Sequence, residues 1–210
     1  HNMSGILINS YVYAASGFPN TKSLAFDGVD EYVNLGNVTA LNGLTSASFS
    51  MWLKLNSTGI EGLFNQWGSS ANRLIYAFMW LANGRIDIYI SGYRSFNVNS
   101  NAIISALSTD QWFNLVITYD GSQAAYADRV KVYIDNQELT GNISFAPTSL
   151  NNSTTDFILG TYPSGTYLEG NMDEFAIFTN TLTTDNINDI YNGGTPNDLA
   201  SLSPVLWYRM

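Results

Sequence analysis

The chain has 210 residues, of which 45% are hydrophobic and only 12% are charged, so it can bury a sizeable core beneath a mostly uncharged polar surface. Its formal net charge of −9 disfavours nucleic acid and anionic membranes as partners, because both carry phosphate. There is no cysteine and the only histidine is His1, so disulfides, cysteine catalysis, serine–histidine triads and thiolate or imidazole zinc sites lack their residues. The longest apolar run, 74–82, is too short to insert across a membrane.

The chain reads as one domain. The first three residues, His1-Asn2-Met3, are interpreted as a cloning remnant, and residues 4–210 as a single β-sandwich domain. No internal repeat or linker-like stretch interrupts residues 22–200, and all-β domains often reach this length. Because the chain ends inside an apolar run around Trp207, we expect the natural polypeptide to be longer.

The first predicted elements are two short strands around an acidic turn between Ser23 and Gly36. The turn Asp27-Gly-Val-Asp30 combines a glycine with carboxylates, which is typical of a tight connection. Alternation of apolar with polar residues then predicts half-buried strands, as in a two-sheet sandwich. The alternating segments are 49–55, 86–90, 112–119 and 130–134.

The segment 74–81 differs from the others because both of its faces are apolar. The two faces carry, respectively, Leu74, Tyr76, Phe78 and Trp80, and Ile75, Ala77, Met79 and Leu81. One face must pack in the core, while the other is an aromatic platform or is covered by a loop or a partner, burial being the commoner fate of such stripes. Asn83-Gly84 predicts a two-residue hairpin turn into the next strand.

The C-terminal part predicts a strand and then the one helix. The segment 170–178 is a strand with an acidic pair, and a short helix follows, capped by Thr183 or Thr184 and ended by Gly193-Gly194. The polar region 91–111 is expected to connect strands without regular structure of its own. The predicted fold is therefore an all-β, two-sheet antiparallel β-sandwich, or jelly roll, with one short helix near the C-terminus.

Six motifs follow one another in a fixed order across residues 22–192. They are Phe26-Asp-Gly-Val-Asp30, Phe49-Ser-Met-Trp-Leu53, Trp112-Phe-Asn-Leu-Val-Ile-Thr-Tyr-Asp-Gly121, Val132-Tyr-Ile-Asp-Asn136, Ile158-Leu-Gly160 and Gly170-Asn-Met-Asp-Glu-Phe-Ala-Ile-Phe178. This order resembles laminin-G-like and pentraxin-like domains of the concanavalin A-like lectin/glucanase superfamily. The resemblance implies a jelly roll that binds sugars or surfaces, although a fold does not fix a function. The chain is also similar to laminin-G-like domains of phage and marine microbial structural proteins, which implies an extracellular or virion-surface location.

The superfamily resembled here includes glycoside hydrolases, which usually need two carboxylates facing one cleft, either ~5 Å or ~6.5–9.5 Å apart. Asp173 and Glu174 are consecutive, so a regular strand would point them to opposite sides of the sheet. The other strand acids, Asp87 and Asp135, are isolated, and the sequence has no glycine-rich phosphate loop. The sequence therefore predicts a protein that is not an enzyme.

Calcium is the one cofactor that we expect, because many laminin-G-like relatives bind it at a sheet rim. Calcium takes six to eight oxygen ligands from carboxylates, amides and carbonyls. The predicted metal ligands are Asp27, Asp30 and Asp173, with Asn34 or Glu174 as further candidates. The alternative is an ordinary turn at Asp27 and a strand-end hydrogen-bonding role for Asp173.

Aromatic rings with a few well-placed polar groups are the usual parts of a sugar site. The segment 64–96 is rich in both, and the loop 161–167 carries tyrosines where loops often hold function. The predicted ligand-binding residues are Arg73, Tyr76, Trp80 and Tyr89 in the segment, and Tyr162 and Tyr167 in the loop.

The sequence favours a non-catalytic carbohydrate- or surface-binding module of an extracellular or virion structural protein, with a cell-surface glycan or polysaccharide as partner. Two hypotheses stay open beside it. One is a purely structural domain of a capsid or fibre protein, in which the strand at 74–81 pairs with another copy in a homo-oligomer. The other is a cryptic glycoside hydrolase.

Overall fold

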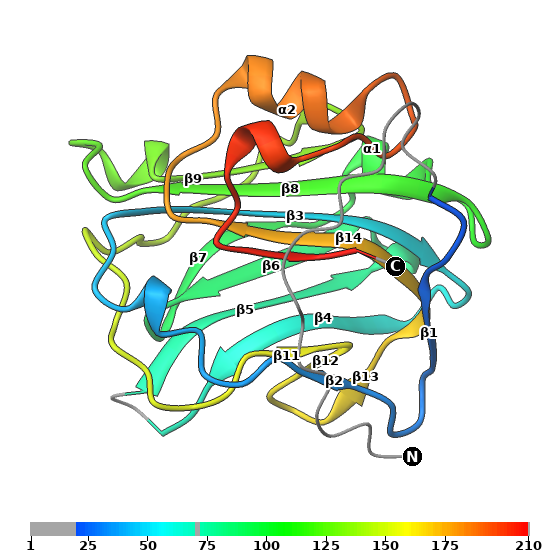
Figure 1. Cartoon of the computed structure of the whole chain (residues 1–210), viewed down its shortest axis with the longest axis horizontal. Coiled ribbons are helices and arrows are strands. Elements are labelled where there is room, and N and C mark those ends of the chain that lie inside the picture. The colour runs from blue at the N-terminus through cyan, green and yellow to red at the C-terminus, as the bar shows by residue number, and fades with distance from the viewer. Residues whose placement is uncertain (1–19, 70–71, 210) are drawn as a thin grey trace.

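The computed structural model describes residues 20–69 and 72–209, which form two antiparallel β-sheets packed face to face (Figure 1). The interpreted cloning remnant, His1-Asn2-Met3, lies outside these residues. Because strands dominate and a short helix lies near the C-terminus, the predicted all-β sandwich is confirmed.

The two sheets are assembled from strands that are distant in sequence. Sheet A contains β1 (Leu24–Asp27), β14 (Glu169–Phe178), β3 (Ser46–Leu55), β8 (Trp112–Asp120), β9 (Val130–Ile134) and β10 (Gln137–Glu138) in spatial order, with β15 (Leu206–Tyr208) also paired to β14. Sheet B contains β2 (Val33–Asn34), β11 (Ile158–Leu159), β4 (Ile60–Trp67), β5 (Arg73–Trp80), β6 (Arg85–Ile90) and β7 (Tyr93–Val98) in spatial order. A separate small hairpin is formed by β12 (Thr161–Tyr162) and β13 (Thr166–Tyr167).

The core lies between the two sheets and is rich in aromatic rings. Phe49 of sheet A stacks on Phe64 of sheet B at 5.4 Å between ring centroids, and Phe64 stacks on Phe157 at 5.5 Å. All three side chains are fully buried. Ile75 and Met79 of β5 face the same core, as the alternation along that strand predicts. Burial of each large apolar side chain contributes about 1.5–3 kcal/mol.

The predicted helix is confirmed as α2 (Thr184–Tyr191), which covers the outer face of sheet A (Figure 1). The Thr183 hydroxyl accepts a hydrogen bond from the backbone N–H of Asn186, so the helix begins with a capping box. Ile187 and Ile190 are buried in one cluster with Phe178 of β14. In the described part of the chain, neither α-helix packs on the outer face of sheet B.

The region 91–111 is more regular than expected, because it forms β7 and a short helix α1 (Ala102–Ser105). The alternation of apolar and polar residues does not reveal β7, because a polar residue, Asn97, occupies one of its buried positions. The backbone N–H of Asn97 donates to the carbonyl of Asn142 at 2.9 Å. The hairpin between β5 and β6 is confirmed, but its connection is a four-residue loop, 81–84, that ends with Gly84 in the left-handed region at φ +54°.

Candidate ligand-binding site

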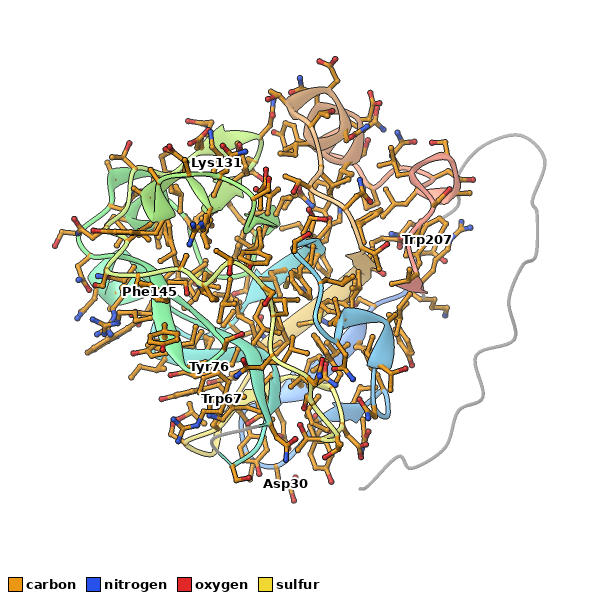
Figure 2. The ribbon with its side chains drawn as sticks, turned by 90° about the vertical axis from the view of Figure 1, so that its left-hand side faces the viewer. Asp30, Trp67, Tyr76, Lys131, Phe145 and Trp207 are labelled. Carbon is orange, nitrogen blue, oxygen red and sulfur yellow. The ribbon has the colours of Figure 1, made fainter. Side chains whose placement is uncertain are left out.

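Aromatic side chains gather on the outer face of sheet B, which points away from the core. We call this cluster the aromatic face; its members are Trp67, Tyr76, Phe78, Tyr89 and Tyr162. Tyr76 stacks on Tyr89 with 4.4 Å between ring centroids, and Trp67 meets Tyr76 edge-on at 4.6 Å. Figure 2 shows Trp67 and Tyr76 side by side, with Trp207 on the opposite side of the molecule. Each such ring pair adds about 0.5–1.5 kcal/mol beyond its burial.

Strand register brings these rings together. Tyr76 of β5 is directly opposite Tyr89 of β6, and residues opposite one another in antiparallel strands share a face. On the other side of β5, the β4 register shifts between Gln66 and Trp67, so that Trp67 is opposite Arg73. Such irregularities re-aim a side chain, and here the shift turns the indole toward the tyrosines.

The β12–β13 hairpin lies against one end of the aromatic face. A side chain at Gly62 would clash with it, because a Cβ atom there would be 2.4 Å from the carbonyl oxygen of Thr166. The amide of Asn65 also donates to the carbonyl of Thr161 at 3.0 Å. Held in this way, Tyr162 stacks on Phe78 at 5.0 Å and leaves Phe78 only 8% exposed. The hairpin therefore closes one end of the face and leaves the half-buried Trp67, Tyr76 and Tyr89 at the other.

Three arginines border the aromatic face. Arg85 and Arg94 both form ion pairs with Asp87, whose side chain is fully buried between them. The Asp87 carboxylate raises the pKa of Arg85 above its ordinary value by hydrogen bonding. Arg94 also lies 5.8 Å from the centre of the Tyr89 ring, and Arg73 lies 5.4 Å from the ring of Trp67. Burial raises the pKa of Tyr76, so its hydroxyl stays protonated and can donate a hydrogen bond.

The structure brings four of the six predicted ligand-binding residues together. Arg73, Tyr76 and Tyr89 lie on the aromatic face, and Tyr162 reaches it from the hairpin. Trp80 is four positions along β5 from Tyr76, about 13 Å at a rise of ~3.3 Å per residue, and lies opposite Arg85. The sixth residue, Tyr167, pairs with Thr161 inside the hairpin. Whether any of the six contacts a ligand stays a prediction.

Sequence reasoning did not select Trp67, Phe78, Asp87 and Arg94 as site residues, although the first two belong to the aromatic face and the other two border it. Phe78 had a usable signal, because it lies on the face of β5 that the selected Tyr76 already marks. Arg94 had none, since its pairing with Tyr89 depends on β7, a strand that the polar sequence conceals. Trp67 had none, since the register shift that places it cannot be read from alternation. Asp87 was interpreted as an isolated acid, whereas its two arginine partners are supplied by β6 and β7.

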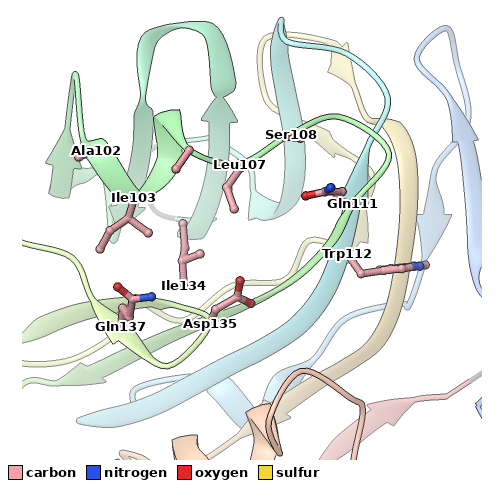
Figure 3. Close-up of a pocket in the computed structure, with 10 residues that line it drawn as sticks. Ala102, Ile103, Leu107, Ser108, Gln111, Trp112, Ile134, Asp135 and Gln137 are labelled. Atoms are coloured by element: carbon pink, nitrogen blue, oxygen red, sulfur yellow. The ribbon is translucent and has the colours of Figure 1, made fainter.

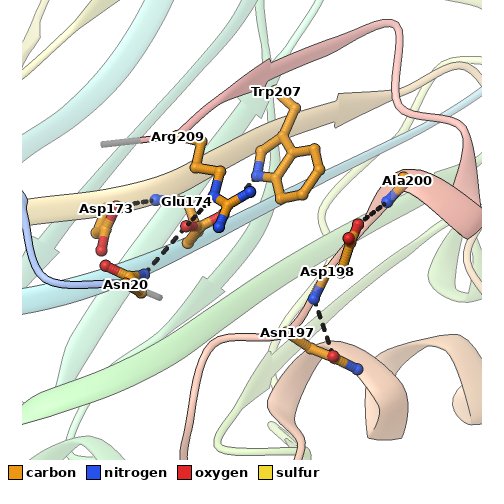
Figure 4. Close-up of polar contacts among 8 residues, drawn as sticks. All are labelled: Asn20, Asp173, Glu174, Asn197, Asp198, Ala200, Trp207 and Arg209. Atoms are coloured by element: carbon orange, nitrogen blue, oxygen red, sulfur yellow. Dashed lines mark hydrogen bonds and ion pairs between the residues drawn. The ribbon is translucent and has the colours of Figure 1, made fainter. Parts of the chain in front are cut away.

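The acidic pair Asp173 and Glu174 is arranged differently from a regular strand (Figure 4). The register of β14 against β3 shifts after Asp173, and Glu174 adopts φ +50°. The backbone N–H of Glu174 donates to Asp173, the indole N–H of Trp207 donates to the Glu174 carboxyl group, and Asn20 donates to it at 3.0 Å. The expectation that the two acids point to opposite faces of a regular strand is therefore wrong, because a bulge intervenes.

Two buried carboxyl groups have pKa values in the range of a general acid, which requires a test for catalysis. Desolvation raises the pKa of Glu174 from 4.5 to about 8 and that of Glu61 from 4.5 to about 7. Both side chains are 2% exposed, and Asp173 is 4% exposed, so none of them faces a cleft that a substrate could enter. The Glu61 carboxylate accepts the backbone N–H of Glu169 at 2.7 Å, which is a structural role. These groups lack the access that glycoside hydrolysis needs.

The predicted calcium ligands are not gathered at one point. Asp27 and Asp30 lie on an exposed turn, where an Asp27 oxygen accepts the backbone N–H of Val29 at 2.8 Å. The β1–β14 register pairs Asp27 with Glu169, four residues from the buried Asp173, which is about 13 Å along the strand. Among residues 20–69 and 72–209, no group of three or more acidic or imidazole side chains is placed to hold a metal ion. Calcium binding stays a prediction, but one ion cannot join Asp27 to Asp173 here.

An open groove of about 440 Å³ lies elsewhere, between α1 and the β9–β10 turn (Figure 3). Its lining includes Ile103, Leu107, Ile134, Asp135 and the 41% exposed Trp112. Trp112 is the single aromatic residue among the lining side chains. The groove therefore offers one stacking ring where the aromatic face offers several.

No helix in the described part of the chain is long and apolar enough to cross a membrane.

Comparison with solved structures shows what the fold is similar to. A heptameric pentraxin from Limulus polyphemus matches with a TM-score of 0.62 at 12% identity, over 83% of this chain and 79% of that one. Domain 4 of AbnA, an extracellular arabinanase from Geobacillus stearothermophilus solved with arabinotriose, matches with a TM-score of 0.58 at 19% identity, over 80% and 76%. A candidate carbohydrate-binding protein from Bacteroides ovatus matches with a TM-score of 0.61 at 15% identity, over 87% of this chain and 50% of that one.

No curated protein sequence matches the chain. The laminin-G-type family model described as the concanavalin A-like lectin/glucanases superfamily matches residues 27–188, which contain both sheets apart from β1 at one end and β15 at the other. The match covers most of the chain, including five of the six sequence motifs in full. The chain therefore belongs to the concanavalin A-like lectin/glucanase superfamily.

Proposed function

We propose that the protein is a non-catalytic carbohydrate-binding module and that its ligand, a cell-surface glycan or polysaccharide, lies on the aromatic face. The observation that carries this proposal is the half-buried group of Trp67, Tyr76 and Tyr89, held together by strand register and bordered by arginines. Sugar rings stack their C–H faces on such aromatic surfaces, and guanidinium and phenol groups donate hydrogen bonds to sugar oxygens. The similar fold of the arabinanase domain solved with arabinotriose supports the proposal.

The proposed setting is an extracellular or virion-surface structural protein, where such a module would meet glycans. Calcium would act, if bound, through the exposed turn that carries Asp27 and Asp30, remote from the buried Asp173. Its proposed role is therefore to stabilise the turn rather than to bridge protein and sugar.

A glycan and polysaccharide array tests the proposal, with each sample run in calcium and in EDTA. The variant is Trp67→Ala, and Trp112→Ala is the matched control because its indole is exposed at the groove beside α1. We expect binding to be lost in Trp67→Ala and kept in Trp112→Ala, because the first substitution removes an aromatic wall of the proposed site and the second does not.

The outcomes separate the alternatives. Loss of binding in Trp112→Ala with retention in Trp67→Ala would move the ligand to the groove of Figure 3. A wild-type protein that binds nothing on the array in either buffer would refute the proposed function. Binding that is lost only in EDTA would make calcium part of the ligand site, and binding that survives EDTA would leave calcium a structural role or none.

A second candidate function is self-association as a structural domain. The predicted pairing of the strand at 74–81 with another copy is wrong, because β5 is already paired with β4 on one edge and β6 on the other. Self-association is favoured by three exposed rings in contact: Phe145 lies 4.5 Å from Tyr93 and 6.2 Å from Tyr126, and each is 41–50% exposed. Clustered exposed aromatic residues are typical of protein interfaces, and the Limulus pentraxin of similar fold is heptameric. Light scattering after size exclusion tests it: an oligomer that dissociates in Phe145→Ser supports self-association, and a monomeric wild type excludes it.

A further inference from the structure

We propose that the ligand of the aromatic face is an anionic saccharide, one that carries carboxylate or sulfate groups, and that Arg73 contacts the anion. The inference rests on the proposed function, because it names the class of glycan that the same face would bind. It is drawn from how positive charge is distributed in a chain that is otherwise short of it.

Positive charge is concentrated on this one face. The chain has eight lysine and arginine residues against seventeen acidic ones, yet three of the eight, Arg73, Arg85 and Arg94, border the aromatic face. Within residues 20–69 and 72–209, Asp87 is the carboxylate that forms ion pairs with these arginines, and it is shared by Arg85 and Arg94. The face is therefore locally cationic within a protein of net charge −9. A local excess of this kind attracts anions even where the whole molecule repels them.

Arg73 is the arginine of this face that forms no ion pair with a described residue, so we expect it to be the one that contacts the ligand. Its Nε atom is buried without a hydrogen-bond partner among the described residues. By contrast, Nε of Arg85 donates to Asp87, and Nε of Arg94 donates to the Tyr89 hydroxyl at 3.1 Å and forms an ion pair with Asp87. A buried donor without an acceptor carries a free-energy cost, and its presence shows that no described side chain neutralises this guanidinium group. The guanidinium fork matches carboxylate and sulfate oxygens, which makes arginine the preferred residue for such groups.

The position of Arg73 is fixed before any ligand arrives. Its guanidinium lies 5.4 Å from the Trp67 ring centre, and its backbone carbonyl accepts the amide of Asn151 at 3.1 Å. A cation held over an indole keeps its edge available for hydrogen bonds. Stacking on Trp67 and ion pairing with Arg73 can thus act on adjacent parts of one sugar unit. A neutral sugar would need the rings but would leave the arginine unpaired.

Matched polysaccharide pairs test the inference, each pair sharing a backbone and differing in charge. Polygalacturonate and its methyl ester probe carboxylate, and dextran sulfate and dextran probe sulfate. We expect wild-type affinity for at least one charged member to exceed that for its neutral partner about tenfold or more, the range for a hydrogen bond to a charged group. The preference should also weaken with added salt, because the face is partly open to solvent.

Three variants locate the effect. Arg73→Gln should bring the charged-to-neutral affinity ratio close to one, and Arg73→Lys should restore part of it because the charge returns without the fork. Lys131→Gln is the matched control, since it removes one positive charge from an exposed position on sheet A, far from Trp67 in Figure 2. Circular dichroism confirms that each variant is folded.

The outcomes distinguish this inference from the function on which it rests. Equal binding of charged and neutral members, or glycan-array binding confined to neutral sugars, overturns the anionic ligand and leaves the carbohydrate-binding module standing. A preference that Lys131→Gln reduces as much as Arg73→Gln also overturns it, because the attraction would be general. A wild type that binds no saccharide at all overturns both.

Discussion

The indole N–H of Trp207 donates a hydrogen bond to the buried carboxyl group of Glu174, and this contact ties β15 to the neighbouring strand β14 of sheet A (Figure 4). Asn20 donates to the same carboxyl group at 3.0 Å, so the first and last parts of the described chain meet at one side chain. Arg209 lies 3.9 Å from it and provides a nearby positive charge. Glu174 is only 2% exposed, so its polar atoms depend on these partners rather than on water.

Trp207→Phe should therefore destabilise the protein. Phenylalanine keeps most of the apolar ring but removes the donor, which leaves a buried carboxyl oxygen short of a partner at a cost of about 1–3 kcal/mol. For a chain of this size, about 2–4 °C in Tm corresponds to each kcal/mol. Trp112→Phe is the control, because that indole is 41% exposed. Thermal unfolding should show the larger loss for Trp207→Phe, and equal losses would rule out the proposed contribution of this hydrogen bond.

Stability should fall as the pH rises from mildly acidic to mildly basic. Burial raises the pKa of Glu174 from 4.5 to about 8 and that of Glu61 to about 7. Between the unfolded and folded values, the folded protein holds protons that the unfolded chain has released, so raising the pH favours unfolding. The stabilisation is complete below about pH 4.5 and is lost as the pH passes about 8. Melting temperatures measured across this range should decline for the wild type.

Glu174→Gln tests which group is responsible, because glutamine keeps the shape and cannot ionise. Its melting temperature should depend less steeply on pH than that of the wild type. Glu138→Gln is the control, since Glu138 is half exposed and, within the described part of the chain, pairs with Lys131 and the hydroxyl of Tyr133. If Glu174→Gln leaves the slope unchanged, the pH dependence must come from other groups.

The sequence could predict those features that depend on residues close together in the chain. Alternation along β5 correctly separated the outward Tyr76 from the core residue Ile75, and the Thr183 cap placed the start of α2. Features set by distant segments could not be predicted in this way. The position of Trp67 depends on a register shift between β4 and β5, and the Glu174 contacts join residues up to 154 positions apart.

The residues of the aromatic face divide in the same way. Its tyrosines could be predicted from strand periodicity, but the ion-pair partners of its charged residues could not. Asp87 looked isolated because its ion pair with Arg94 depends on the pairing of β6 with β7, a strand that the polar sequence around Asn97 concealed. The calcium hypothesis met the opposite problem, since it assumed a closeness of Asp27 and Asp173 that the β1–β14 register does not provide.

Gly62→Ala should displace the β12–β13 hairpin. An added Cβ would lie 2.4 Å from the carbonyl oxygen of Thr166 and 2.6 Å from the backbone nitrogen of Tyr162, so backbone must move. Overpacking of this kind costs about 1–3 kcal/mol. Because the hairpin carries Tyr162 onto Phe78, glycan affinity should also fall. Gly59→Ala is the control, since the nearest atom to an added Cβ there is the side-chain oxygen of Ser57 at 3.1 Å and not backbone. Unchanged stability and binding in Gly62→Ala would show that the hairpin does not shape the site.

Asp87→Asn should cost more than the loss of an ordinary surface ion pair. The substitution keeps the side-chain shape but removes the shared counter-charge of Arg85 and Arg94, which then repel each other beside the rings. Because the arginine side chains are 23% and 39% exposed, water offsets part of the loss, and we expect a decrease of about 1–3 kcal/mol in the free energy of unfolding.

Urea denaturation measures this decrease, and Glu138→Gln is the control because it removes the exposed pair with Lys131, which should contribute below about 1 kcal/mol. Asp87→Asn should also affect ligand binding. It makes the aromatic face more positive, and it loosens the positions of the two arginines. If Asp87→Asn were no less stable than Glu138→Gln, Asp87 could not be the group that holds the two arginines in place. The arrangement of charge on the face would then depend on the stacking of Arg94 on Tyr89 and Arg85 on Phe78 instead.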